Sequence, residues 1–161
     1  MQDDPYINHR LRIKSLSESV YLDYPLIVQL ETLALCSAAC NFCPYPVLTR
    51  KGERMDDFLL DKVLSDLSDI PKDIPFQLAP FKVNEPFLDS RLIPLLKQMN
   101  QSLPQAKILL YSNASPITES KALALAEIDK IAYLCISLNE YRPDVYTQVM
   151  SLPWERTWER L

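Results

Sequence analysis

Apolar runs rich in β-branched residues alternate along the chain with segments whose apolar residues recur at helical spacing. Runs of the first kind predict buried strands, and recurrence at every third or fourth position predicts amphipathic helices. Such patterns predict strands over 26–35, 75–82, 107–112 and 130–138, and helices over 57–69, from about residue 90 and from residue 118. Repeated strand–helix units with crossover connections predict an α/β fold with a parallel sheet, either open or curling toward a barrel.

Capping residues stand where these helices are expected to begin. Asp56 or Asp57 can cap the first helix, Asp89 or Ser90 the second, and Thr118 the third. Short polar side chains of this kind accept hydrogen bonds from the free N–H groups of a first helical turn. The polar positions therefore support the same three helices as the apolar ones.

The end of the chain carries one further strand and one further helical pattern. The run 130–138 is the most continuous apolar stretch in its half of the sequence, which predicts a strand buried on both faces. Beyond it, Pro153 suits a first helical turn, and Trp154, Trp158 and Leu161 follow at helical spacing. We expect the two tryptophans to pack in the core.

The character of the chain changes at about residue 24. Residues 1–24 carry mixed charge and no sustained period, so we expect an N-terminal extension there with at most one short element. Residues 25–161 carry the repeated units and are expected to form one core domain. Because the sequence stops inside a helical pattern after four units, we expect that domain to be incomplete, with its C-terminal units missing.

Composition narrows the possible functions. The 161 residues suit one domain, and the 48% apolar and 24% charged residues are typical of a globular protein. The only glycine is Gly52, whereas a Walker loop or a Rossmann fingerprint needs several glycines so that the backbone can approach phosphate. The only histidine is His9, which excludes a zinc site of the His-x-x-x-His type.

Charge and hydropathy narrow the possible partners and the compartment. The net charge of −4 gives no general attraction to nucleic acid or to an anionic membrane, so neither is an expected partner. No apolar run approaches the ~20 residues that span a bilayer, and the N-terminus lacks a signal-peptide core. A cytoplasmic location is the default. In that reducing compartment, cysteines are metal ligands, reactive thiols or buried apolar residues more often than disulfides.

Three of the four cysteines lie close together in a predicted loop. Cys36, Cys40 and Cys43 form the pattern Cys-x-x-x-Cys-x-x-Cys. A structural zinc site usually takes four protein ligands, and no second cysteine pair or histidine stands nearby. In a cubane of four irons, three cysteines would bind three irons and leave the fourth open to another ligand. A zinc clip completed by a distant residue and a plain iron–sulfur electron carrier remain alternatives. Cys135, in the middle of a strand, is expected to be a small buried apolar residue.

The cysteine spacing, with Phe42 before the last cysteine and Pro44 after it, resembles that of the radical S-adenosylmethionine (SAM) enzyme family. As in that family, the cysteine loop follows the first strand. Met55, before the first predicted helix, is typical of the peptide-modifying, SPASM-type branch. The resemblance implies an α/β fold, namely a partial (βα)6 TIM-like radical SAM barrel of which about four βα units are present.

Motifs at the later strand ends extend the resemblance. The family's Gly-Gly-Glu-Pro motif has a partial counterpart in VNEPFLD, where Asn84 and Glu85 stand, although Val83 and Asn84 replace the two glycines. Residues 112–114 (Ser-Asn-Ala) stand in place of Thr-Asn-Gly, and residues 136–140 (Ile-Ser-Leu-Asn-Glu) in place of Ile-Ser-Leu-Asp-Gly. The fifth and sixth strands of the family have no counterpart in these 161 residues.

The resemblance also implies cofactors and a role for each site residue. The cofactors are a [4Fe-4S] cluster and SAM, whose methionine amino and carboxylate groups chelate the open iron. The implied roles are Cys36, Cys40 and Cys43 as iron ligands, Phe42 near adenine, Asn84 and Glu85 at the methionine amino group, Asn113 as a hydrogen-bonding group at a strand end, and Ser137 at the ribose or carboxylate.

The implied reaction is radical chemistry. An electron from the reduced cluster cleaves SAM, and the resulting 5′-deoxyadenosyl radical abstracts hydrogen from a peptide or a small-molecule substrate. The implied partners are that substrate and an electron donor of the flavodoxin or ferredoxin type. Taken singly, Phe42 suits core packing, Glu85 a solvated loop, and Asn113 and Ser137 ordinary hydrogen bonds at strand ends. Their shared location at the strand ends favours the functional interpretation.

Overall fold

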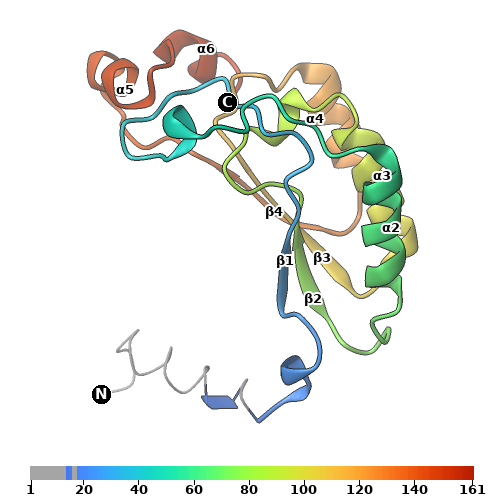
Figure 1. Cartoon of the computed structure of the whole chain (residues 1–161). Helices are drawn as coiled ribbons and strands as arrows, with labels where there is room; N and C mark the ends of the chain where they lie inside the picture. The colour runs from blue at the N-terminus through green and yellow to red at the C-terminus, as the bar shows by residue number, and fades with distance from the viewer. Residues whose placement is uncertain (1–13, 16–17) are drawn as a thin grey trace, which may run out of the picture.

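The chain folds around a parallel sheet whose four strands lie in the order of the sequence (Figure 1). The computed structural model describes residues 14–15 and 18–161. Its strands are β1 (Ile27–Gln29), β2 (Phe76–Ala79), β3 (Ala106–Ser112) and β4 (Ile131–Ile136). Each strand pairs in parallel with the next along the chain. The predicted α/β fold with a parallel sheet is confirmed.

Three helices cover one face of this sheet. They are α2 (Asp57–Ser68), α3 (Leu92–Ser102) and α4 (Glu119–Ala126), and Figure 1 shows them all on the same side of the strands. Two shorter helices, α5 (Pro143–Met150) and α6 (Trp154–Trp158), follow β4 at the end of the sheet where the cysteine loop also lies. The single-turn 3₁₀ helices are η1 (Val20–Leu22), η2 (Tyr45–Val47) and η3 (Pro86–Leu88).

The helix starts confirm two of the three predicted caps. The carboxylate of Asp56 accepts a hydrogen bond from Leu59 N at 2.7 Å, and Thr118 Oγ1 accepts one from Lys121 N at 3.3 Å. The third prediction was wrong, because α3 begins at Leu92 with Arg91 in the capping position. Asp89 stands two residues earlier and accepts from Arg91 N at 2.9 Å, so its carboxylate orders the turn that leads into the helix.

The main core lies between the sheet and these three helices. Phe76, Leu78, Ile108 and Leu110 point from the strands toward the buried leucines and methionine of α2 and α3. Burying a side chain of this size contributes about 1.5–3 kcal/mol relative to leaving it in water. This helix-covered face therefore carries most of the apolar burial that holds β1 to β4 together.

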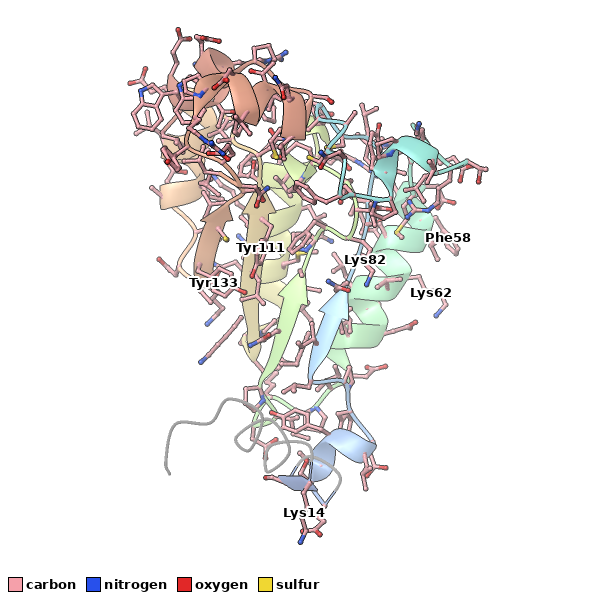
Figure 2. All side chains as sticks on the ribbon, turned by 90° about the vertical axis from the view of Figure 1, so that its left-hand side faces the viewer. Lys14, Phe58, Lys62, Lys82, Tyr111 and Tyr133 are labelled. Atoms are coloured by element: carbon pink, nitrogen blue, oxygen red, sulfur yellow. The ribbon has the colours of Figure 1, made fainter. Side chains whose placement is uncertain are left out.

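The opposite face of the sheet is open. Figure 2 looks onto this face, where Tyr111 and Tyr133 extend from β3 and β4. Tyr133 is 43% exposed, so the prediction that the fourth strand is buried on both faces was wrong. Helices cover only one side of the strand, and its alternate side chains reach the open side. Cys135 lies in the middle of β4 as predicted, but its side chain is half-buried rather than buried.

The first strand is shorter than the sequence pattern predicted. Strand β1 ends at Gln29, although apolar residues continue to residue 35. Beyond it, Leu33 makes an isolated antiparallel bridge with Arg54 on the far side of the cysteine loop. The second half of the apolar run therefore closes the base of that loop instead of extending the sheet.

Packing near the chain ends differs in two respects from the expectations. Tyr21 and Tyr24, in the expected extension, pack against the main core, and Tyr21 Oη donates to the carbonyl of Pro75 at 2.6 Å. The division of the chain at residue 24 stays a prediction. Trp154 packs edge-on against Tyr146, whereas Trp158 stacks on Trp154 and is 58% exposed, so only Trp154 fits the predicted core packing.

Within the described residues, no helix combines the length and the apolar character that a bilayer crossing requires.

The cap of α2 gives a direct stability test. We expect Asp56→Ala to lower the free energy of unfolding by about 0.5–2 kcal/mol, because Leu59 N loses its only side-chain acceptor. The matched control is Asp69→Ala at the other end of α2, where a negative charge opposes the helix dipole and its removal is neutral or slightly stabilising. Urea denaturation followed by circular dichroism measures both, and equal losses in the two variants would contradict the capping role.

Candidate functional site

A cavity of about 240 Å³ opens where the carboxyl ends of the strands meet the cysteine loop. Its wall is made by the cysteine loop and by the segments that follow β2, β3 and β4. All of the site residues predicted from the sequence line this one cavity: Cys36, Cys40, Phe42, Cys43, Asn84, Glu85, Asn113 and Ser137. Residues separated by a hundred positions are thus brought to one place by the parallel topology, as expected for the strand ends of an α/β fold.

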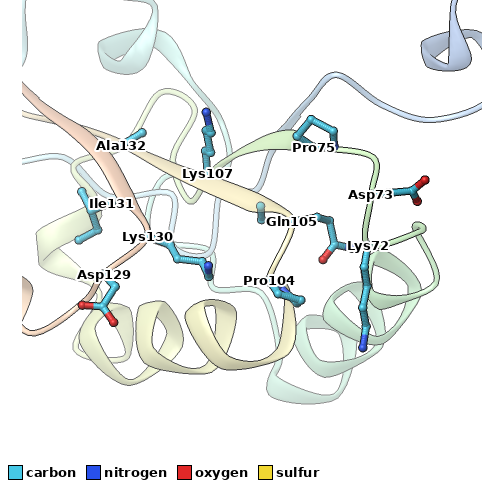
Figure 3. Close-up of a pocket in the computed structure, with 11 residues that line it drawn as sticks. Lys72, Asp73, Pro75, Pro104, Gln105, Lys107, Asp129, Lys130, Ile131 and Ala132 are labelled. Atoms are coloured by element: carbon cyan, nitrogen blue, oxygen red, sulfur yellow. The ribbon is translucent and has the colours of Figure 1, made fainter.

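A larger cavity, of about 670 Å³, lies at the opposite end of the sheet (Figure 3). It is lined by the loops that enter β2, β3 and β4, and it contains none of the predicted site residues. The side chains of Lys72, Lys107 and Lys130 around it extend in different directions. Because chemistry in parallel α/β folds collects at the carboxyl ends of the strands, the smaller cavity is the candidate site.

The base of the cysteine loop is closed by backbone hydrogen bonds. Ala34 N donates to Glu53 O at 2.8 Å, and Gly52 N donates to Ala34 O at 2.7 Å. Gly52 has φ +83°, a left-handed conformation that glycine adopts without strain. The one glycine of the chain is therefore used in the turn that brings the two ends of the loop together.

Arg91 clamps the two ends of the loop from the side of α3. Its guanidinium donates to the carbonyls of Thr32 and Met55, each at 3.0 Å, which lie just before and just after the loop. Asp89 pairs with the same guanidinium at 2.8 Å. Burial raises the pKa of the Asp89 carboxyl, but the hydrogen bonds from Arg91 outweigh it and leave that pKa below its usual value. The pair therefore stays ionised and holds the loop at neutral pH.

The three cysteines are free thiols, each half-buried. Cys36 Sγ accepts hydrogen bonds from Ala38 N at 3.4 Å and from Asn113 Nδ2 at 3.9 Å, and Cys43 Sγ accepts from Tyr45 N at 3.5 Å. Burial raises the pKa of Cys36 to about 11, with smaller contributions from Glu85 and the other two thiols. Burial, and then Cys43, also raise the pKa of Cys40. Without a metal, Cys36 and Cys40 are therefore protonated at neutral pH.

The thiols line one cavity but are not gathered around a single point. Among the described residues, no three His, Cys, Asp or Glu side chains form a group that could hold one metal ion. A cubane cluster does not need such a group, because each thiolate binds a different iron at a different corner. The half-buried sulfurs along one wall can therefore serve a cluster without converging on one ion.

Glu85 is buried and joins three segments, so its interpretation as a solvated loop residue is wrong. Its Oε1 accepts hydrogen bonds from Ser112 Oγ at 2.8 Å and Phe87 N at 3.2 Å, and its Oε2 accepts from Asn113 N at 2.7 Å. Burial raises the pKa of this carboxyl, against the lowering effect of these hydrogen bonds. A carboxylate offers about four lone-pair sites, so one is left for a further donor.

Asn84 carries a polar group that the protein leaves unpaired. Its Oδ1 accepts a hydrogen bond from Lys82 N at 3.0 Å, whereas its Nδ2 is buried without a partner. A buried donor without an acceptor costs about 1–3 kcal/mol. On the wall of a cavity, such a donor is suited to an acceptor atom of a bound molecule.

The turn after β3 is built from Asn113 and Ala114. Asn113 Nδ2 donates to Ser37 Oγ at 3.0 Å, and Asn113 Oδ1 accepts from Ser115 N at 3.0 Å. Ser37 and Ser115 also share a hydrogen bond at 2.9 Å, so the cysteine loop is tied to the end of β3. Ala114, which stands where the related motif has glycine, is fully buried with φ +64°.

The two remaining predicted residues have less constrained side chains. Phe42 is 60% exposed, so its interpretation as a core residue is wrong and its ring stands at the edge of the cavity. Ser137 is fixed through its backbone, where its N–H donates to Ser112 O at 2.8 Å. The structure places both residues on the cavity wall and leaves their roles as predictions.

The sequence did not single out several other residues that line the cavity. Those with the clearest contacts are Phe81 and Tyr111, whose ring centroids lie 5.1 Å apart, and Met150, whose Sδ lies 3.5 Å from Cys40 Sγ and accepts a hydrogen bond from Asn139 Nδ2. Phe81 stands two residues after the end of β2, and Tyr111 precedes the predicted Asn113 by two positions. Their position near strand ends could therefore have identified Phe81 and Tyr111 from the sequence, whereas no feature of the sequence pointed to Met150.

Comparison with known proteins relates the chain to SAM-dependent enzymes. No protein-family model matches it. The S-adenosyl-L-methionine-dependent 2-deoxy-scyllo-inosamine dehydrogenase of Niallia circulans is 27% identical over 104 residues, which cover 63% of this chain and 40% of the relative. The chain therefore spans less than half the length of that protein.

Solved structures share the fold. The structure of BtrN in complex with AdoMet and 2-DOIA aligns with a TM-score of 0.62 and 19% identity, over 84% of this chain and 54% of BtrN. The structure of Streptococcus suis SuiB bound to the precursor peptide SuiA aligns with a TM-score of 0.67 and 20% identity, over 99% of this chain and 35% of SuiB. The expected partial radical SAM barrel, and the resemblance to that family of enzymes, are confirmed.

The buried carboxylate gives a second stability test. We expect Glu85→Gln to lower the free energy of unfolding by about 1–3 kcal/mol. Whichever oxygen the amide nitrogen replaces, one backbone N–H, of Phe87 or of Asn113, then faces a donor instead of an acceptor. Glu159→Gln is the control, since Glu159 is exposed at the end of α6. If urea unfolding shows both variants equal to the parent protein, the three-way tie is wrong.

The raised pKa of Cys36 predicts slow alkylation in the metal-free protein. Its thiol has a pKa of about 11 against an ordinary value of 9.0, so the thiolate fraction near pH 8 is roughly 100-fold lower than in the unfolded chain. The rate of iodoacetamide labelling at Cys36 should therefore keep rising with pH up to about 11, whereas in urea it should level off earlier. Peptide mass spectrometry measures both profiles, and identical profiles would contradict the burial effect.

Proposed function

We propose that this chain is the N-terminal part of the catalytic domain of a radical SAM enzyme. In this proposal Cys36, Cys40 and Cys43 hold a [4Fe-4S] cluster, and SAM binds between the cluster and the polar strand ends. The observation that carries the proposal is the shared cavity, because three thiols, Phe42 of the same loop and four polar residues that follow strands meet there as the family resemblance requires.

The donor atoms of the cavity suit these two groups. Thiolates are the soft ligands that iron–sulfur clusters take, and three of them leave one iron free for a small molecule. The remaining lone pair of Glu85 suits an ammonium group, and the unpaired Nδ2 of Asn84 suits a carboxylate or sulfide acceptor. A bound ammonium would also offset the burial that raises the pKa of Glu85.

Bound together, a reduced cluster and SAM supply reductive cleavage of a carbon–sulfur bond and radical abstraction of hydrogen. The residues of this chain bind and orient them. Hydrogen bonds from Ala38 N and Asn113 Nδ2 to Cys36 Sγ stabilise that sulfur as a thiolate. Glu85 and Asn84 would fix the methionine end of SAM, Ser137 its ribose or carboxylate, and Phe42 would lie beside the adenine.

The substrate is proposed to be a peptide or a small molecule that enters from the open face of the sheet. Tyr111 connects the open face with the cavity, since it lines the cavity and also stands on the open face beside Tyr133 (Figure 2). The similar proteins represent both classes of substrate: one is named as a dehydrogenase of the small molecule 2-deoxy-scyllo-inosamine, and the other, SuiB, is bound to the precursor peptide SuiA. A flavodoxin- or ferredoxin-type donor would deliver the electron. Free thiols and a reducible cluster suit the reducing cytoplasm.

Anaerobic reconstitution with iron and sulfide tests this function. We expect about four irons per chain and an electron paramagnetic resonance (EPR) signal of the reduced cluster that shifts when SAM is added, since SAM would bind the open iron. Cys40→Ala should lose the intact cluster. The matched control Cys135→Ala should retain it, because Cys135 lies on β4 outside the cavity wall.

Two results would overturn the proposal. A single zinc ion in the purified, oxygen-protected protein would identify a structural clip. A cluster whose spectrum ignores SAM would identify an electron carrier. Loss of iron in Cys135→Ala would show instead that the ligand assignment is wrong.

A further inference from the structure

The last turn of α5 grips the cysteine loop on both sides of Cys40. Ala39 N donates to Met150 O at 3.1 Å, and Asn41 N donates to Val149 O at 3.0 Å. The last carbonyls of a helix have no partner within the helix and must find one elsewhere. Here the loop supplies that partner, so the backbone on either side of Cys40 is fixed by α5.

The side chain of Met150 completes this contact. It is 1% exposed, and its Sδ lies 3.5 Å from Cys40 Sγ. Asn139 Nδ2 donates to the same Sδ at 3.3 Å, which holds the thioether from the side of the segment after β4. One buried methionine thus contacts both the thiol of Cys40 and the Asn139 amide in the segment that follows β4.

Helix α5 is itself tied to the end of β3. Tyr146 is fully buried and its hydroxyl shares a hydrogen bond with Thr157 Oγ1 at 2.8 Å. Thr157 Oγ1 also donates to Asn113 O at 3.2 Å, next to the turn that contacts Cys36. The cysteine loop is therefore held from two directions by elements that are connected to each other.

We propose that Met150 is a positioning residue, which fixes the orientation of the Cys40 side chain and shields its sulfur from water. This inference rests on the proposed function in so far as Cys40 binds iron. Groups around the ligands of a metal centre control ligand orientation and solvent access, and through them the redox potential. A methionine fills an irregular space of this kind well, because it is unbranched and apolar.

The shape and volume of the Met150 side chain, rather than its hydrogen bond, are expected to position Cys40. A Cys40 sulfur bound to iron has no proton to donate, so only packing against Met150 remains in the loaded protein. Sulfur is also a weak acceptor. Leucine has nearly the same volume and is apolar, so Met150→Leu should preserve the positioning, whereas Met150→Ala should leave space for water and for rotation of Cys40.

The test compares Met150→Ala and Met150→Leu with Met99→Ala. Met99 is an equally buried methionine, 0% exposed, but it lies on α3 in the main core, a cluster that includes no cysteine. Met99→Ala therefore controls for a general loss of stability. The first readout is the rate of iodoacetamide labelling at Cys40 in the metal-free protein, followed by peptide mass spectrometry. The second is the EPR spectrum and air sensitivity of the reconstituted cluster.

In Met150→Ala, we expect Cys40 to be labelled about tenfold faster, which corresponds to ~1.4 kcal/mol less to expose the thiol. The cluster of that variant should show altered g-values and decay faster in air. Met150→Leu and Met99→Ala should resemble the parent protein in both readouts.

The proposal is overturned if Cys40 is labelled no faster in Met150→Ala than in Met99→Ala, or if Met150→Leu behaves like Met150→Ala. The labelling experiment needs no cluster, so it separates the two proposals. Failure of the parent protein to assemble a cluster would reject the proposed function, whereas unchanged labelling of Cys40 would reject the role of Met150.

Discussion

The carboxylate of Glu85 is the interaction on which the arrangement of the site depends. Its side chain accepts hydrogen bonds from Ser112 and Asn113 at the end of β3, while its own backbone N–H donates to Leu35 O at 2.8 Å, at the start of the cysteine loop. Glu85, a single residue in the segment that follows β2, thus connects the segments that follow β1 and β3. Without the carboxylate, the cysteine loop would still contact the turn after β3 through Ser37, but the segment after β2 would lose its hydrogen bonds to the end of β3.

This tie places a charge where charge is costly. Burial raises the pKa of Glu85, and Lys121, whose charge counteracts this rise, is bound to the carbonyls of Phe87 and Pro116 rather than to the carboxylate. Hydrogen bonds from two backbone N–H groups and one hydroxyl offset the loss of solvation only in part. A buried carboxylate of this kind is suited to a cationic ligand. Stability of the protein alone therefore disfavours an ionised Glu85, whereas binding of a cation requires it. A cationic ligand would supply the positive charge that offsets the burial of this carboxylate.

A shortage of glycine shapes the turns around this tie. Ala114 occupies the left-handed region in a turn where the family motif has glycine, and Ser151 does the same at the end of α5. A residue with a Cβ in this region costs roughly 1–2 kcal/mol. The surrounding contacts must hold these turns in place, through Asn113 for the first and the loop contacts of α5 for the second. The strained turns lie beside the cysteine loop, so the packing that sustains them also fixes the site.

The sequence could predict those features that depend on local pattern. The parallel sheet, the α2 and α4 caps and the placement of the cysteines at a strand end follow from periodicity, capping chemistry and the crossover rule. Two errors came from burial, because an apolar run does not reveal whether helices cover one face of a strand or both. One result is the exposed Tyr133 on a strand predicted to be buried. The other is the shortened β1, because the second half of the predicted strand lies at the base of the cysteine loop and not in the sheet. Met150 was hidden for a different reason: a methionine at the end of a helical pattern is ordinary, and only the return of α5 to the cysteine loop, 110 positions earlier, gives it a contact with Cys40. Long-range contacts of this kind are set by the fold as a whole, so the residues that orient a ligand are harder to predict than the ligand itself.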